Sequence, residues 1–143
     1  MVAWREIANS FGASAFAKRY VDEPGTHEVI AWCERAHELA LSVMVIPEIV
    51  SAFCRLQREA RLDDAQFRQL KQDLMVSIAD ALICDTVPQV IQYVVNALEA
   101  CALHGMDAIH IGAALACAAE AFAPADVRQC EAAKHFGLQV VVL

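Results

Sequence analysis

The chain has 143 residues, 58% hydrophobic and 20% charged, so it is long and apolar enough to form one domain with a sizeable core. Its net charge of -7 argues against a surface coated with cations for nucleic acid, although a small basic cleft remains compatible with it. Six cysteines stand singly, without zinc-site spacing, and are expected as thiols in a reducing cytoplasm. No secretory signal is visible and the apolar run 109–123 is too short for a bilayer, so we expect a cytoplasmic protein without membrane contact.

The first third of the chain is predicted to alternate between strands and helices. A weak strand signal covers Ile7–Phe11, and a turn at Asp22–Gly25 precedes a helical face that runs from Val29 to Ala40. The continuous apolar run Leu41–Ile46 predicts a strand buried on both faces. Pro47 then suits the first position of a helix.

Helix starts and short apolar runs continue through the middle of the chain. Asp63 and Gln66 have the spacing of a capping box and predict a helix beginning there. The run Ala81–Cys84 predicts a second buried strand, and Pro88 predicts the start of another helix. Met106–Ala121 reads as a central helix with little polar face.

The C-terminal segments complete an α/β pattern. We expect a short strand at Ala121–Ala123, a helix over Asp126–Phe136 that stops at Gly137, and a last strand at Leu138–Val142. Helices between short buried strands predict an α/β sandwich with a mainly parallel central sheet of four to five strands. We expect one domain over residues 1–143, in which 1–10 form an atypical N-terminal segment.

Three acidic residues follow these apolar runs or begin a helix: Glu48, Asp107 and Asp126. Carboxylates with hydrophobic flanks are costly unless a cation gathers them, and a hard divalent ion takes oxygen ligands. Each acid also has a purely structural interpretation. Glu48 suits the dipole of a helix start, Asp107 suits a cap, and Asp126 suits an N-cap with Gln129 completing a capping box.

Taken together, several segments resemble PIN-domain proteins, and more closely the VapC-type toxins of bacterial toxin–antitoxin pairs. The resemblance covers nearly the whole chain from Phe11, in the order and spacing of its parts. It is carried by Phe11–Gly25, Ser42–Glu48, Met106–Ala114, Phe122–Asp126 and Ala132–Val140. It implies a PIN-like three-layer α/β/α sandwich.

The resemblance also implies a chemistry. In that family clustered acids hold Mg²⁺ or Mn²⁺, and metal-activated water cleaves RNA phosphodiesters. Carried over by position, Glu48, Asp107 and Asp126 are the expected catalytic and metal-binding residues, and Ser14 is a small hydroxyl residue near the metal. The expected partners are RNA, a VapB-like antitoxin and a second copy of the chain in a homodimer.

Two neighbouring cations are candidates for substrate contact. Lys18 and Arg19 follow Ser14 closely enough to reach RNA phosphates near the cleft, and ordinary surface solvation explains them equally well.

Two positions depart from the family pattern. Gly12 stands where the first acid is expected, and Pro124 stands where a Thr or Ser is usual. The vacated acid at Gly12 leaves two functional interpretations: an endoribonuclease with impaired activity, or a catalytically inactive PIN-like protein that keeps antitoxin or RNA binding. A helical adaptor without a nucleic-acid role is a third, more distant, alternative.

Other side chains are weighed between core, surface and partner roles. His110 is expected as a satisfied core histidine rather than a ligand. A basic stripe after Glu48 is either a solvated face or a contact for RNA or an acidic antitoxin segment. An apolar set on the neighbouring helices is either core or a groove for a partner helix. The stripe is Arg55, Arg58 and Arg61, and the apolar set is Phe53, Leu56, Phe67 and Leu70.

Overall fold

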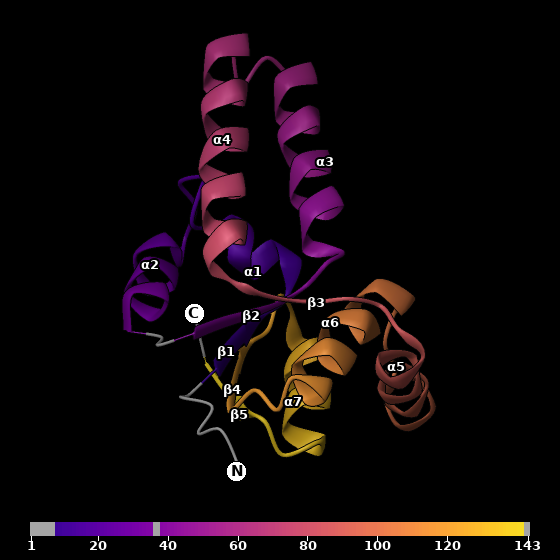
Figure 1. The fold of residues 1–143 in the computed structure, drawn as a ribbon. Helices are drawn as coiled ribbons and strands as arrows, with labels where there is room; N and C mark the ends of the chain where they lie inside the picture. Colours follow the sequence, from indigo (N-terminus) through magenta and orange to yellow (C-terminus); the bar gives the residue numbers. More distant parts are fainter. Residues whose placement is uncertain (1–7, 36–37, 142–143) are drawn as a thin grey trace.

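The computed structural model describes residues 8–35 and 38–141 and shows a parallel sheet covered by helices on both faces (Figure 1). The strands are β1 (Ala8–Phe11), β2 (Glu38–Ser42), β3 (Leu82–Cys84), β4 (Ala121–Ala123) and β5 (Gln139–Val140). The helices are α1 (Ala13–Ala17), α2 (Thr26–Arg35), α3 (Val45–Arg58), α4 (Asp64–Asp80), α5 (Pro88–Ala100), α6 (Gly105–Ala116) and α7 (Val127–His135). The predicted three-layer α/β/α sandwich is confirmed.

The sheet has the order β3-β2-β1-β4-β5, and every observed pair of strands is parallel. β1 is central although it comes first in the described sequence. After β1 the chain adds β2 and β3 on one side, and later β4 and β5 on the other. The carboxyl ends of β1 and β4 therefore flank the point where the winding reverses, which is where sheets of this kind gather ligands.

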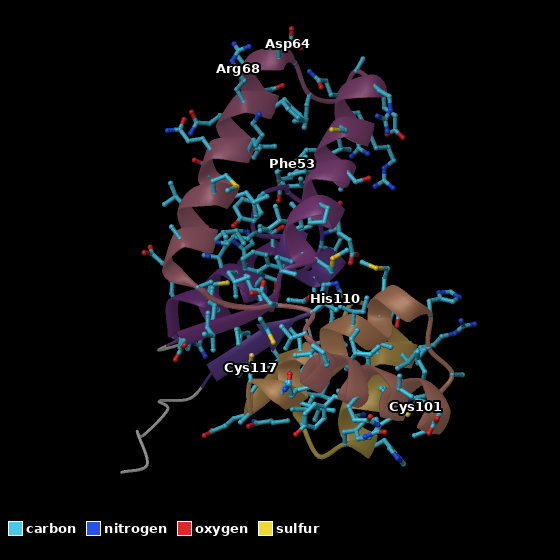
Figure 2. The ribbon with its side chains drawn as sticks, turned by 45° about the vertical axis from the view of Figure 1, so that its right-hand side comes forward. Phe53, Asp64, Arg68, Cys101, His110 and Cys117 are labelled. Carbon is cyan, nitrogen blue, oxygen red and sulfur yellow. The ribbon has the colours of Figure 1, made fainter. Side chains whose placement is uncertain are left out.

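Two hydrophobic cores lie on opposite faces of the sheet, and β4 contributes to both. Ala121 and Ala123 belong to the core with α1, α2, α3 and α4, whereas Phe122 belongs to the core with α5, α6 and α7. This alternation is the period-2 pattern of a strand buried on both faces. Figure 2 shows Phe53 in the space between α3 and α4, and Figure 1 shows that these two helices form a hairpin that projects from the sheet.

Local signals located several element boundaries correctly. Asp63 accepts a hydrogen bond from the N–H of Gln66 at 2.7 Å, and the Gln66 side chain accepts one from the N–H of Asp63 at 2.9 Å. The predicted capping box at the start of α4 is therefore confirmed. Pro88 is the first residue of α5, also as predicted.

The second strand lies earlier in the sequence than predicted. β2 covers Glu38–Ser42 instead of Leu41–Ile46, and α3 begins at Val45 instead of Pro47. Ser42 ends the strand because its hydroxyl accepts a hydrogen bond from the N–H of Met44, which starts a turn. The predicted helical face up to Ala40 was also wrong. α2 ends at Arg35, and Ala40 belongs to β2, where it pairs with β1.

Smaller differences affect the other helices and strands. α6 ends at Ala116 rather than Ala121, because Ala118 has a left-handed backbone with φ 53°. β1 begins at Ala8, and Ile7 and Val142 of the predicted strands lie outside the described residues. The cysteines all lie within the described ranges, and none forms a disulfide.

Within the described ranges, no helix is long and apolar enough to cross a bilayer.

Candidate functional site

Gly12 lies at the reversal point of the sheet, directly after β1. Its N–H donates to the carbonyl of Ala123 at the end of β4, with an N–O distance of 2.9 Å. Its backbone is extended, with φ -67°, so conformational freedom does not require a glycine here. The reason for the glycine is the close approach of other groups.

Gln129 fills the space that a side chain at position 12 would occupy. A Cβ built on Gly12 would overlap the Gln129 Oε1 atom and would stand 3.1 Å from the backbone nitrogen of Ala125. Gln129 is fully buried. Its Oε1 accepts from the N–H of Ala125 at 2.8 Å, and its Nε2 donates to the carbonyl of Asp107 at 3.3 Å. A neutral amide with hydrogen-bond partners at both ends therefore occupies the place where the family resemblance led us to expect a carboxylate.

Asp126 is the N-cap of α7, as one of the two sequence interpretations held. Its Oδ1 accepts from the N–H of Gln129 at 2.9 Å. The expected capping box is not formed, because the Gln129 side chain bonds to Ala125 and Asp107 instead of returning to the N–H of Asp126. The carboxylate is thus partly committed to the helix start.

Asp107 lies in the first turn of α6 but does not cap it. The N-cap residue is His104, whose Nδ1 lies 3.7 Å from Asp107 Oδ2. Burial raises the pKa of the Asp107 carboxyl, and the nearby charge of Asp126 raises it further, with a smaller contribution from Glu48. Asp126 and Glu48 therefore each lie within electrostatic range of Asp107.

Glu48 is bound to a histidine from the opposite face of the sheet. Its Oε1 lies 2.7 Å from His110 Nε2, and this contact joins α3 to α6 across 62 positions of sequence. His110 is 2% exposed and Glu48 about a third exposed on their side chains. His110 is thus buried with a hydrogen-bond partner, although its Nδ1 has none within the described residues. Figure 2 shows His110 at the base of the α3–α4 hairpin.

The side chains do not form a ready metal cluster. Across residues 8–35 and 38–141, no group of three or more His, Cys, Asp or Glu side chains is placed to hold a metal ion. The chemistry of three oxygen donors suits Mg²⁺ or Mn²⁺, but the arrangement around Asp126 and Glu48 does not fit one as it stands.

The other predicted site residues have mixed outcomes. Lys18 lines a shallow pocket of about 270 Å³ together with Asp126 and Cys130, so it lies close to the acidic edge. Arg19 lies beside Cys33 instead. Ser14 belongs to α1, and its side chain lies outside the described part of the structure.

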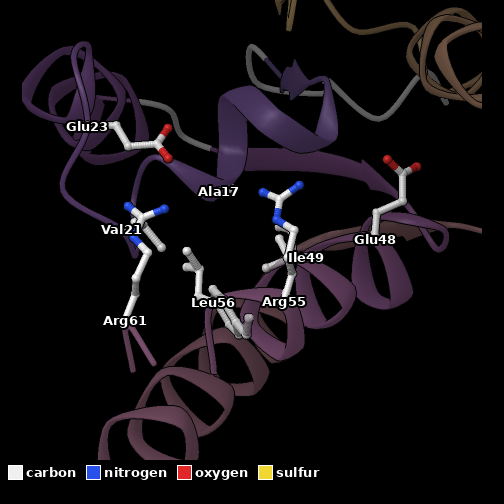
Figure 3. A pocket seen from close by; sticks show the side chains of 10 residues that line it. Ala17, Val21, Glu23, Glu48, Ile49, Arg55, Leu56 and Arg61 are labelled. Atoms are coloured by element: carbon white, nitrogen blue, oxygen red, sulfur yellow. The ribbon is translucent and has the colours of Figure 1, made fainter. Parts of the chain in front are cut away.

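A second hollow lies between α1 and α3 and has a volume of about 230 Å³ (Figure 3). Its floor is apolar, with Ile49, Phe53 and Leu56, and its rim carries the charges of Arg55 and Arg61. The three arginines of the predicted basic stripe therefore do not lie on one surface: Arg55 and Arg61 line this pocket and Arg58 does not. Arg61 lies beyond the end of α3.

Sequence reasoning missed two features of these sites. Gln129 was read only as part of a capping box, and its contact with Gly12 joins segments that are far apart in the sequence. Arg61 was placed on the helix, and only the left-handed conformation of Ala60, with φ 57°, shows that the chain has turned back by then. Gly12 itself was the available signal, since a glycine directly after a predicted strand can mark the close approach of another group.

The chain matches no family model and no curated protein. It is similar in fold to several solved structures. The crystal structure of VapBC2 from Rickettsia felis, bound to a DNA fragment from their promoter, aligns with 94% of this chain and 98% of its own, at 11% identity and a TM-score of 0.65. FitAcB from Neisseria gonorrhoeae aligns with 95% and 97% of the two chains, at 15% identity and a TM-score of 0.68. PAE2754 from Pyrobaculum aerophilum aligns with 95% and 84%, at 17% identity and a TM-score of 0.65.

These similarities correct the identification made from the sequence segments. At identities of 11–17% the likeness shows the fold alone, so the assignment of this chain to the PIN-domain family as a VapC-type toxin is wrong as a statement of family membership. What is confirmed is the fold class, a PIN-like arrangement of short parallel strands between helices. Motif order along a chain reflects the shared topology, and topology does not determine function.

Proposed function

We propose that this chain is a non-catalytic binding protein built on a fold that other proteins use in toxin–antitoxin complexes. The observation that carries this proposal is the buried Gln129 amide beside Gly12. The resemblance to metal-dependent nucleases implies a carboxylate at the reversal point of the sheet, and this chain has a neutral side chain there that is hydrogen-bonded at both ends.

The remaining acids support the same conclusion. Glu48 is engaged with the buried His110, and Asp126 caps α7. These two carboxylates therefore each have a hydrogen-bond partner within the protein. Asp107 has only the distant contact with His104 Nδ1 at 3.7 Å, and burial, followed by the charge of Asp126, raises the pKa of its carboxyl.

A protein partner is inferred from the fold and from the surface. Solved structures of this fold include toxin–antitoxin complexes, and we infer that this chain also binds a small, antitoxin-like protein. The projecting α3–α4 hairpin offers the binding surface (Figure 1). Its exposed apolar side chains include Met75 and Val76.

Self-association is a separate part of the proposal. α5 and the residue before it expose apolar side chains with helical spacing: Val87, which is the N-cap residue, then Ile91, Val95 and Leu98. The helix carries one charged residue, Glu99, so two copies that meet along the apolar row would bring few like charges together. Sedimentation velocity of the wild type and of Ile91→Lys tests this, and a wild-type monomer at every concentration rejects the homodimer.

RNA cleavage in Mg²⁺ or Mn²⁺ tests the absence of catalysis. We expect no cleavage by the wild type and none by Gly12→Asp alone, because Gln129 occupies the space needed by the new carboxylate. The double variant Gly12→Asp/Gln129→Ala provides both the acid and the room for it, and is the variant expected to gain metal-dependent cleavage. Wild-type cleavage that is lost in Asp107→Ala would reject the proposal.

A metal-dependent endoribonuclease is the second candidate. Burial, followed by the charge of Asp126 and a smaller effect of Glu48, raises the pKa of Asp107, and perturbed carboxyls of this kind cluster at functional sites. On this alternative, Gly12 weakens activity without abolishing it. Mn²⁺ would then raise the melting temperature of the wild type but not of Asp107→Ala. The non-catalytic proposal expects no such shift in either protein.

A further inference from the structure

The pocket between α1 and α3 combines cations with an apolar floor. Ile49 and Phe53 are almost completely buried at its base, and Leu56 is 6% exposed. Both arginines at its rim are exposed. An occupant that satisfies both parts must present an anionic group beside an apolar side chain.

The backbone at the end of α3 brings the second arginine to this rim. Ala60 adopts φ 57°, and the N–H of Arg61 then donates to the carbonyl of Leu56 at 2.9 Å. This closure reverses the chain, so that Arg61 returns beside the last turns of the helix. Figure 3 shows Arg55 and Arg61 on opposite sides of Leu56, with both side chains extending towards the segment that contains Ala17 and Val21.

The two guanidinium groups are weakly neutralised by the protein itself. Among the described residues, Arg61 forms a distant ion pair with Glu59, in which Nη1 lies 3.8 Å from Oε2. The side chains of Arg61 and Glu59 are both largely exposed, so this pair is weak. Within the described part of the chain Arg55 forms no ion pair. The carboxylate of Glu48 points away from both arginines (Figure 3). Two guanidinium groups spaced around an apolar floor are therefore available to an external anion.

We propose that this pocket binds an acidic peptide segment in which Glu or Asp side chains alternate with Leu or Phe. The inference rests on the proposed partner-binding function and specifies the chemistry of the partner. Glu23 and Glu48 stand on either side of the two arginines (Figure 3), so a short segment can place its carboxylates between them, whereas a continuous polyanion would have to run past both acids. A Leu side chain of the segment would contact the apolar groups that line the pocket, and a phosphodiester backbone has no apolar group to place there.

Peptide titration followed by NMR tests the proposal. The probe is the acetylated, amidated hexapeptide LEELFE, and its matched control is the uncharged LQQLFQ. We expect LEELFE to shift the Nε–Hε signals of Arg55 and Arg61 and the methyl signals of Ile49. We expect LQQLFQ to bind about tenfold more weakly or worse, because it cannot form charge-assisted hydrogen bonds.

Variants locate the effect. The pair Arg55→Gln/Arg61→Gln should lose LEELFE binding about tenfold or more, whereas Arg58→Gln/Arg68→Gln removes the same charge elsewhere on the exposed hairpin and should retain it. Unchanged methyl spectra of the free variants establish that they are folded. Equal losses in the two pairs, equal binding of both peptides, or tighter binding of a hexauridylate RNA at the same signals would overturn the pocket assignment.

The pocket and the proposed function fail in different experiments. Wild-type RNA cleavage rejects the non-catalytic function whatever the peptides do. Absence of peptide shifts in a chain that cleaves no RNA rejects the acidic-segment pocket alone.

Discussion

The two faces of the sheet are packed in different ways. Among the described residues, the buried core beneath α5, α6 and α7 consists mostly of alanine and valine, with Phe122 as its fully buried aromatic residue and Phe136 packed at its margin. The core beneath α1 to α4 contains Phe16, Phe53, Leu41 and Leu74, and it leaves the arginine-rimmed pocket open beside Phe53. On the first face Gly112 lies close to the backbone of Val94, whereas on the second face a pocket remains beside Phe53. The acidic edge takes Asp107 and His110 from the close-packed face and Glu48 from the open one.

The largest expected effect compares one phenylalanine from each face. Phe122→Ala should destabilise the fold by about 3–5 kcal/mol, because the surrounding alanines have no side chains able to fill the cavity. Phe53→Ala should cost less, near the lower end of that range at about 3 kcal/mol, since its site already borders a pocket open to water. Urea unfolding with unchanged m-values measures both. An equal or larger cost for Phe53→Ala would show that the two faces do not differ as described.

A glycine tests the close contact of α5 with α6. A Cβ on Gly112 would stand 2.9 Å from the backbone nitrogen of Val94, so Gly112→Ala must separate the two helices and should cost about 1–3 kcal/mol. The matched control is Gly105→Ala in the same helix, where the new Cβ meets no atom within 4 Å. Thermal unfolding should leave that control unchanged or slightly stabilised. Similar behaviour of both variants would show that the helix contact is looser.

The connection between the faces is tested at His110. His110→Ala removes the buried partner of Glu48 and should cost about 1–2 kcal/mol. Glu48→Gln retains a side chain that can accept from or donate to the imidazole, so its cost should stay below about 1 kcal/mol. Chemical denaturation distinguishes them. If Glu48→Gln proves as costly as His110→Ala, the negative charge matters more than the hydrogen bond.

The smallest effect concerns Asp107 and depends on pH. Burial, and then the charge of Asp126, raises its pKa in the folded protein above the unfolded value of about 4, so the ionised form opposes folding at neutral pH. The free energy of unfolding rises again as the pH falls from the Asp107 pKa of the folded protein to the lower pKa of the unfolded chain. Asp107→Asn should therefore be more stable than wild type at pH 7, by less than about 1 kcal/mol, and the gain should vanish near pH 4. Melting curves in EDTA across this range measure it, and an advantage independent of pH would contradict it.

Local signals predicted the starts of helices well and the long-range contacts poorly. Asp63 with Gln66, and Pro88, act through bonds or dihedral angles within one turn, so the sequence alone sufficed. The apolar run after Ala40 was ambiguous, since a buried strand and a buried helix start have the same composition there. The boundary between β2 and α3 is set by the pairing of β2 with β1 and β3, and no local sequence pattern predicts that pairing.

The candidate site shows the same limit. The topology predicted that Glu48 and Asp126 would lie at the carboxyl edge of the sheet, because each follows a predicted strand, and the family resemblance implied that Asp107 would join them. The partners that occupy them were not predictable. His110 is 62 positions from Glu48, and the contact between Gln129 and Gly12 depends on how α7 packs against the end of β1.

The central position of β1 has a consequence for how the chain is made. Ser10 pairs with Phe122, more than one hundred residues later, so one edge of the central strand stays open until β4 emerges from the ribosome. Such distant pairing slows folding, and an open strand edge invites pairing with other chains. Nascent chains that stall before Ala121 should therefore associate with one another or with chaperones instead of settling into a smaller stable domain.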